Sequence, residues 1–261
     1  MTNIIKRFFK LDLWALAAVL LSLPLLIPFL QNGLPQIDAS GLHVHRLVSA
    51  GAGLDSGVLW PRWSPYLHLG YGAPLTDFYA PGVYWLGGIL WRVLPFSAVT
   101  VYKFLLAVIL LVYPLGVYYW VRTFGTRAGA LVAAAAYVYA PLNFRQLWIE
   151  QNLAQFAALA LVPWVLWALQ RAAIYRTRWR VIVAAFLVAA LILTHHTTAI
   201  LFAPFILLYL LLVALTYPHG MRRLVFIYMG LSLVIGLLLS TIYWLPALAE
   251  LSYTHTSALR D

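Results

Sequence analysis

Long apolar runs separated by short polar segments dominate this chain. The clearest runs are 13–30, 104–121, 200–215 and 225–245, and each approaches or reaches the roughly 20 apolar residues that a helix needs to cross the hydrocarbon of a bilayer. No strand-like alternation of apolar and polar residues accompanies them. Because backbone groups in lipid must be hydrogen-bonded internally, the pattern predicts membrane-spanning α-helices.

An additional apolar stretch, 81–95, decides the topology. It is short, contains Gly87 and Gly88, and is rich in Tyr and Trp, which favour the headgroup boundary. We therefore expect 81–95 to lie along the outer interface without crossing. The candidate crossings are then 13–33, 98–121, 127–141, 153–170, 181–195, 198–217 and 225–246.

The basic residues support this topology. With the N-terminus inside and 81–95 outside, eleven of the seventeen Lys and Arg residues fall on the cytoplasmic side, as the positive-inside rule requires. If 81–95 crossed, the arginines between 171 and 180 would lie outside. The same topology leaves only Asp12 near the cytoplasmic face. The other six acidic residues fall outside, and they are Asp38, Asp55, Asp77, Glu150, Glu250 and Asp261.

Composition agrees with a membrane protein. The chain is 64% hydrophobic and only 9% charged, with a mean hydropathy of +0.89, whereas soluble domains are about 25% charged. The net charge of +10 does not indicate nucleic-acid binding, because the basic residues are scattered in short loops between apolar runs. The absence of cysteine excludes disulfides and thiolate metal sites. We predict an all-α, polytopic transmembrane helix bundle, a single domain over 1–261 with juxtamembrane helices in a long outer loop, 34–97.

Candidate chemistry begins in the outer stretch 34–80, which is too long for a simple connector. Asp38 and Ser40 are candidate N-caps of a short helix, on which His43 and Arg46 are three residues apart and share a face. The positive end of that helix would favour the ionised form of Asp38. Alternatively, Asp38 only caps the helix, and His43 and Arg46 face lipid headgroups.

The following segment combines Pro, Gly and aromatic residues, as in LWPRWSPY and GYGAPLTDFYAPGVYW. This composition predicts a turn-rich segment laid against the bilayer surface. Aromatic faces there, Tyr79 among them, could stack on a sugar ring, and Asp77 could bond sugar hydroxyls. The alternative is an aromatic belt with a turn aspartate.

Two later segments add polar residues on the same side. PLNFRQLWIEQN carries Arg145 and Glu150, and Glu150 would become functional by pairing across space with Asp38. His195 and His196 occupy an abrupt turn between two apolar runs, where polar side chains are costly unless they face a cavity or a partner. Two adjacent histidines alone are a weak metal signal.

The rest of the chain adds no familiar catalytic motif. Tyr243, Trp244 and Glu250, at the outer end of the last candidate crossing, have the composition of an interface anchor. No P-loop, dinucleotide fingerprint or GxSxG sequence is present.

The order of these features resembles the GT-C membrane glycosyltransferases. It is most similar to bacterial integral membrane proteins labelled as 6-pyruvoyl-tetrahydropterin-synthase-related, although nothing in the sequence indicates pterin chemistry. The resemblance covers essentially the whole chain, and its most specific stretch is PRWSPYLHLGYGAPLTDFYAP. It is also carried by IDASGLHVHRL, LWIEQNLAQFAALALVPWVLWAL, THHTTAILFAPFILLYLL and STIYWLPALAE.

The resemblance implies transfer of a sugar from a polyprenyl-phosphate-linked donor to an acceptor at the outer face of the cell membrane. It implies that Asp38 is the first-loop catalytic acid, acting as base or as ligand of a divalent cation, and that Glu150 is the second. Membrane lipid and a lipid-linked sugar donor are the implied partners, without nucleic acid. Substrate contacts are then expected from His43, Arg46, Asp77, Tyr79, Arg145, His195 and His196.

A transporter or flippase, or a non-enzymatic membrane scaffold, is the alternative. A transporter should place charged residues within its crossings near the bilayer midplane, whereas this chain carries them at the outer ends. Members of the resembled family are usually longer, with a soluble outer domain. We therefore expect that this chain could be the N-terminal part of a longer protein.

Overall fold

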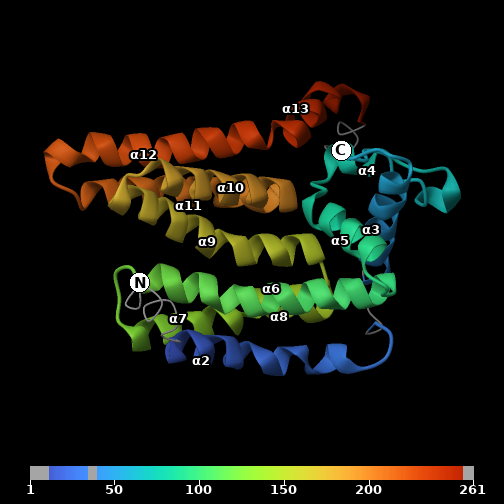
Figure 1. The fold of residues 1–261 in the computed structure, drawn as a ribbon, viewed down its shortest axis with the longest axis horizontal. Coiled ribbons are helices and arrows are strands. Elements are labelled where there is room, and N and C mark those ends of the chain that lie inside the picture. The colour runs from blue at the N-terminus through green and yellow to red at the C-terminus, as the bar shows by residue number, and fades with distance from the viewer. Residues whose placement is uncertain (1–11, 35–39, 255–261) are drawn as a thin grey trace, which may run out of the picture.

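The computed structural model describes residues 12–34 and 40–254, and helices account for most of them (Figure 1). In these ranges the strand-type pairing is a single isolated bridge between Ser64 and Ala73. Five helical segments are long and apolar enough to cross a membrane. They are α2 (Leu13–Ser22) continued by η1 (Leu23–Leu30), α6 (Ala98–Val121), α9 (Leu153–Tyr175), α11 (His196–Leu215) and α12 (His219–Leu239).

Two shorter apolar helices complete the bundle. The predicted crossings 127–141 and 181–195 correspond to α7 (Arg127–Val138), of 12 residues, and α10 (Arg178–Thr194), of 17 residues. Both run alongside the longer helices in Figure 1. The predicted all-α polytopic bundle is therefore confirmed.

The last predicted crossing, 225–246, is wrong in its bounds. The helix α12 ends at Leu239, and a separate helix, α13 (Thr241–Ala249), follows after Ser240. Ser240 leaves helical geometry, with φ −90° and ψ 2°, while its hydroxyl donates to the carbonyl of Leu237. Because the residues on both sides of this break are apolar, hydropathy alone could not reveal it.

Short helices gather at one end of the bundle, between α2 and α6 in the sequence (Figure 1). The helix α5 (Gly82–Val93) has 12 residues and is roughly 18 Å long, well short of the roughly 30 Å of hydrocarbon. The helix α7 is equally short but packs along α2 and α6, whereas α5 packs on α3 at the end of the bundle (Figure 1). The place of α5 therefore agrees with the expectation that 81–95 does not cross. The other short elements of this stretch are α3 (Ser40–Asp55), η2 (His68–Gly70) and α4 (Leu75–Phe78). Later in the chain come α8 (Pro141–Phe144), η3 (Arg145–Ile149) and η4 (Leu251–Tyr253).

The helices α3 and α5 cross through glycine. A Cβ added at Gly88 would lie 2.7 Å from the backbone nitrogen of Gly51, so the two backbones are nearly in contact. Small residues allow helices to approach in this way where polar contacts are few. The crossing holds one face of α3 against one face of α5. Polar residues on these two faces are therefore kept close to each other.

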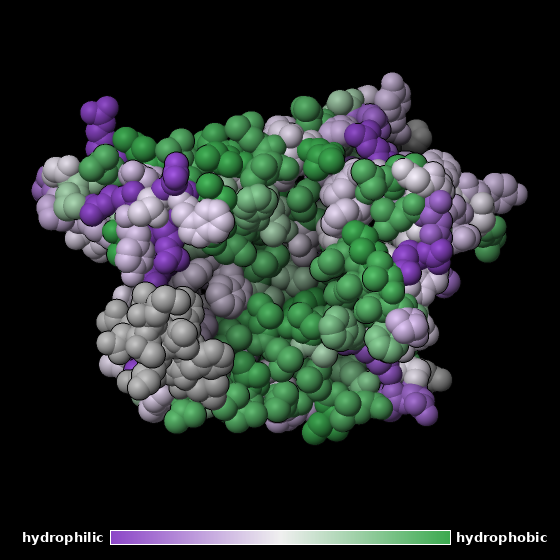
Figure 2. Space-filling view, in the orientation of Figure 1, coloured by the Kyte–Doolittle hydropathy of each residue, from purple (hydrophilic) through white to green (hydrophobic). Residues whose placement is uncertain are grey.

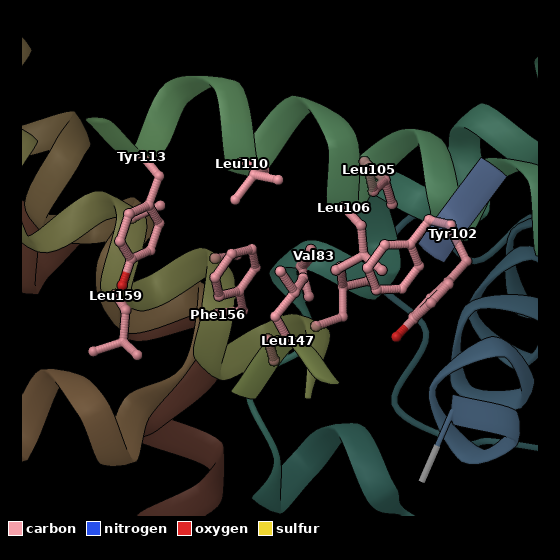
Figure 3. Close-up of a cluster of buried hydrophobic side chains, with 14 of the residues drawn as sticks. Val83, Tyr102, Leu105, Leu106, Leu110, Tyr113, Leu147, Phe156 and Leu159 are labelled. Carbon is pink, nitrogen blue, oxygen red and sulfur yellow. The ribbon is translucent and has the colours of Figure 1, made fainter. Parts of the chain in front are cut away.

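Apolar and aromatic packing holds these short helices against the bundle. Figure 3 shows Val83 of α5 among buried side chains of α6, η3 and α9. The rings of Tyr113 and Phe156 stack with centroids 5.1 Å apart. Because lipid tails are as apolar as these side chains, the gain within the spans comes from close van der Waals packing and not from removal from water. The short helices are therefore positioned by a core shared with the long ones.

Polar residues gather at both ends of the molecule, with a broad hydrophobic surface between them (Figure 2). We call the end that carries α3 and α5 the acidic end, because it holds Asp55, Asp77, Glu150 and Glu250. The opposite end, the arginine end, holds Arg122, Arg127, Arg176, Arg178, Arg180, Arg222 and Arg223. All four ion pairs of the described residues join an arginine to a carboxylate of the acidic end.

Candidate functional site

Histidine, arginine and tyrosine side chains converge at the acidic end of the bundle. They come from α3, from the junction of α4 with α5, and from the turn between α10 and α11. The junction can approach that turn because α5 begins with Gly82, where an added Cβ would lie 2.7 Å from the carbonyl oxygen of Leu193. We call this group the aromatic–basic cluster; it consists of His43, Arg46, Tyr79, Tyr84, His195 and His196.

His43 is buried against Tyr84. The residue is only 3% exposed. Its Nδ1 lies 2.6 Å from the Tyr84 hydroxyl oxygen, and the two rings stack at an interplanar angle of 8°. Burial, with the charge of Arg46 and then His195, lowers the pKa of His43 to about 4. Burial also raises the pKa of Tyr84 well above its ordinary value. The hydrogen bond therefore joins a neutral imidazole to a neutral phenol, and the tautomer of His43 decides which of the two donates.

Arg46 lies over two tyrosine rings. Its guanidinium carbon is 4.4 Å from the ring centroid of Tyr79 and 5.8 Å from that of Tyr84. These are cation–π distances. The Arg46 Nε is buried and has no hydrogen-bond partner within the described ranges. Since His43 and Arg46 both contact Tyr84, the predicted shared face of α3 is confirmed, and the alternative of His43 facing headgroups is not what the structure has.

His195 caps the helix α11. Its Nδ1 accepts from the backbone N–H of Thr198 at 3.2 Å and lies 2.8 Å from the Thr198 hydroxyl oxygen. This contact satisfies one of the free amides at the start of the helix. Burial, with His196 and then Arg46, lowers the pKa of His195 to about 4. A structural role is thus established for His195, while substrate contact remains a prediction.

His196 has a different hydrogen-bond partner from His195. Its Nδ1 lies 2.9 Å from the hydroxyl oxygen of Tyr243, and that hydroxyl donates to the carbonyl of Phe78 at 3.2 Å. His196 also lines a cavity of about 610 Å³ between α10, α11, α12 and α13. The predicted turn and its exposure to a cavity are therefore present for His196, although apolar side chains form most of the cavity wall.

Tyr79 joins the parts of the cluster. Its ring lies edge-on to His195, with centroids 5.7 Å apart, and to His196, at 6.3 Å. Its hydroxyl donates to the Asn152 side-chain oxygen at 3.4 Å. Asn152 caps α9, so this contact also ties the cluster to the loop that contains Glu150.

Glu150 and Arg145 form an ion pair with each other. Arg145 Nε lies 2.6 Å from Glu150 Oε1, and the side-chain amide of Gln146 donates to Oε2 at 2.6 Å. Both Glu150 oxygens therefore have partners within its own loop. The structure thus gives Glu150 a local role, and its predicted pairing with Asp38 stays a prediction.

Asp77 is buried beside an arginine shared with a second carboxylate. Arg62 Nε lies 3.5 Å from Asp77 Oδ1 without hydrogen-bond geometry, and Arg62 Nη1 lies 3.8 Å from Glu250 Oε1. Burial and the charge of Glu250 raise the pKa of Asp77, and Arg62 opposes them. Asp77 therefore links α4 to the end of α13, which goes beyond a turn aspartate.

Asp38, the predicted catalytic acid, lies outside the described residues. The helix expected after it is present as α3, which begins at Ser40. Within 12–34 and 40–254, no group of three or more His, Asp or Glu side chains is arranged to hold a metal ion. The described side chains therefore do not by themselves fit a divalent cation, and no chemistry is assigned to one.

Sequence reasoning missed Tyr84 and Asn152, and treated Tyr243 only as an interface anchor. The signal for Tyr84 was available, because it lies three and four residues before Gly87 and Gly88 and so shares the glycine face of α5. Tyr243 gave no such signal, since its contact with His196 joins residues 47 apart.

Comparison with known proteins gives one family. No curated protein and no solved structure matches the chain. A family model described as 6-pyruvoyl-tetrahydropterin synthase related domain, membrane protein, matches residues 76–258. The match spans 183 of the 261 residues and includes Tyr79, both turn histidines and the cavity, while α3 precedes it. The chain therefore belongs to the 6-pyruvoyl-tetrahydropterin synthase-related family of membrane proteins.

Proposed function

We propose that this protein is a membrane glycosyltransferase that moves a sugar from a polyprenyl-phosphate-linked donor to an acceptor at the outer face of the cell membrane. The observation that supports it most is the aromatic–basic cluster at one end of a helix bundle. A cation, imidazoles and tyrosine rings are the groups that bind a phosphate and stack on a sugar. The resemblance of the outer loops to GT-C enzymes also favours this reaction class.

In this proposal Asp38, which precedes in sequence the helix that carries His43 and Arg46, takes the proton from an acceptor hydroxyl or amine. The new bond forms at the anomeric carbon as the carbon–oxygen bond to the phosphate breaks, and the electron pair leaves with the phosphate. Arg46 stabilises that developing charge, as preorganised cations do in phosphate-releasing reactions. Neutral His43, in the tautomer that carries its proton on Nε2, would donate a hydrogen bond to a phosphate or sugar oxygen, with Tyr84 then donating to Nδ1.

The remaining predicted residues take supporting roles. Tyr79 offers a ring for stacking on the sugar, and His195 and His196 offer imidazole hydrogen bonds at the turn. Asp77 bonds sugar hydroxyls. Glu150 is the proposed second acid and Arg145 a phosphate contact, and both functions require their mutual ion pair of 2.6 Å to open when substrate binds.

The proposed sidedness follows from charge. The arginine end faces the cytoplasm together with the N-terminus, and the acidic end faces outward, because basic loops are retained on the cytoplasmic side. The substrate sites then lie at the outer leaflet. A donor could reach them sideways from the bilayer.

Transport is less well supported than surface chemistry. A transporter needs charged groups near the bilayer midplane. Within the candidate spans of the described chain, the charged residues lie near helix ends: Lys103 in the first turns of α6, Arg171 in the last turns of α9, and Arg222 and Arg223 at the start of α12. Lys103 Nζ donates to the carbonyl of Gln31, so its charge already has a partner within the protein.

The test is a transfer assay with purified protein in lipid nanodiscs, a panel of polyprenyl phosphates carrying glucose, mannose or N-acetylglucosamine, and an extract of membrane lipids and glycans that supplies acceptor hydroxyls and amines. We expect the wild type to release polyprenyl phosphate from one of them. Arg46→Gln should lower the rate about 10²- to 10³-fold, the usual loss for a charge-stabilising group. Arg92→Gln is the matched control, because Arg92 pairs with Asp55 at 2.6 Å at the same end. Equal rates for Arg46→Gln and wild type, or release from none of the donors, would contradict the proposal.

A further inference from the structure

A hydrophobic groove leads from His196 into the membrane-spanning part of the bundle. The cavity of about 610 Å³ adjoins a second one of about 190 Å³, and both are lined by Ile192, Ala199, Ala203 and Leu237. We call the two together the α11 groove. It borders α10, α11 and α12 along its length, and α13 covers the part nearest His196.

The groove follows the axis of α11. Its walls include His196 at the first turn of that helix and Leu207 three turns later, a distance of roughly 17 Å along the axis. That is about half the thickness of the bilayer hydrocarbon. The walls at this depth are hydrocarbon side chains, several of them alanines, so the groove has the shape and polarity of a chain-binding site.

The polar groups of the groove lie at one end. His196 and the Tyr243 hydroxyl are joined there, 2.9 Å apart, and the ring of His196 lies edge-on to Tyr79. Arg46 covers Tyr79, with its guanidinium carbon 4.4 Å from the ring centroid. A cation and an imidazole at the end of a hydrocarbon groove complement a ligand with one long chain and one anionic head.

We propose that the α11 groove binds the isoprenoid chain of a polyprenyl phosphate, with the phosphate at the His196 end beside the aromatic–basic cluster. The identity of the lipid rests on the proposed function, whereas the position of its chain comes from the groove. A two-chain phospholipid fits less well, because this single groove would take one chain and leave the other outside. The site also explains how a membrane-dissolved donor presents its sugar–phosphate bond to Arg46.

The direct test is photo-crosslinking of the intact protein in phosphatidylcholine nanodiscs. The probe is a 55-carbon polyprenyl phosphate with a diazirine in its third isoprene unit and no sugar. We expect covalent adducts in 196–207 and 237–251. Unlabelled polyprenyl phosphate should abolish the adducts, and the matching polyprenol should compete about tenfold less well because it lacks the anionic head.

Phosphatidic acid separates a specific site from an ordinary lipid contact. If it displaces the probe as well as polyprenyl phosphate does, the groove holds membrane phospholipid and the inference is overturned. Adducts confined to helices outside the groove would overturn it as well. Neither result depends on a variant that must fold.

Filling the groove gives an independent readout. Ala203→Trp places an indole where the two cavities meet and should weaken probe binding about tenfold or more, because several methylene contacts are lost. Ala136→Trp, on the exposed face of α7, is the control and should bind normally. Unchanged binding by folded Ala203→Trp contradicts the inference.

The two proposals fail separately. Since the probe carries no sugar, binding in the groove without any sugar transfer would refute the glycosyltransferase proposal alone. Sugar transfer by a protein whose adducts lie elsewhere would refute the groove alone.

Discussion

At the scale of single residues, the histidines of the acidic end act as neutral hydrogen-bonding groups. His43 shares a hydrogen bond with the Tyr84 hydroxyl and His195 accepts from the start of α11, and burial is the largest cause of the lowered pKa in both. The sequences GLHVHR and THHTT were enough to predict these histidines as candidate site residues and to place them at one end of the bundle. The capping role of His195 could not, because it depends on where α11 begins.

The lowered pKa values predict loss of stability in acid. Between pH 6.5 and pH 4 the unfolded chain binds protons at His43 and His195 that the folded protein does not, so stability falls as pH falls through this window. For His43 the full shift corresponds to about 3 kcal/mol. Thermal unfolding of the detergent-solubilised protein should show a lower Tm at pH 5 than at pH 7.5. His43→Gln should reduce that difference, while the same substitution at exposed His45 should not.

Substitution of His195 separates capping from chemistry. His195→Ala should cost about 1 kcal/mol, the usual loss for a helix N-cap, and should lower the Tm. His195→Asn should recover most of that stability, because asparagine is a good N-cap. If the stable Asn variant transfers sugar at the wild-type rate, His195 is a cap alone and its predicted substrate contact is wrong.

At the scale of elements, the close crossing of α3 and α5 determines the geometry of the site. It brings His43 and Arg46 of α3 onto Tyr84 of α5. The glycines and aromatic residues of α5 are evident in the sequence and predict a helix that does not span; α5 is not among the segments long and apolar enough to cross, and its orientation stays a prediction. Their partner on α3 was not predictable, since that requires knowing which helices pack together.

An added methyl group at this crossing should be destabilising. Gly88→Ala would place a Cβ 2.7 Å from the Gly51 backbone nitrogen, where no flexible side chain can yield. The overpacking should cost about 1–3 kcal/mol, seen as a lower Tm together with weaker transfer activity. Gly230→Ala in α12 is the control, because its Cβ would meet nothing within 4 Å. An unchanged Tm for Gly88→Ala would contradict the tight crossing.

At the scale of the whole molecule, hydropathy and charge were sufficient to predict the bundle and the gathering of acids at one end. The long spans follow from the length and polarity that a bilayer requires. Two kinds of feature were beyond their reach. The break at Ser240 leaves hydropathy unchanged, and the Arg145–Glu150 ion pair depends on how the chain turns before α9.

Cysteine labelling tests the orientation. The chain has no cysteine, so single cysteines are unambiguous reporters. Leu69→Cys, at a fully exposed position of the acidic end, should react with an impermeant maleimide on intact cells. Arg92→Cys should react from the same side, and Arg178→Cys only after permeabilisation. Labelling of Arg178→Cys on intact cells, with protection of the other two, would reverse the proposed sidedness.

The central claim, that this membrane protein transfers sugar from a polyprenyl phosphate, is tested most directly by donor consumption with wild type and Asp38→Asn. Asparagine caps a helix nearly as well as aspartate but cannot accept a proton, so stability should be kept. Loss of a positioned base should lower the rate about 10²- to 10⁴-fold. We predict donor consumption by the wild type and this loss in folded Asp38→Asn. Near-normal consumption by the variant, or none by folded wild type with any donor of the panel, would contradict the account.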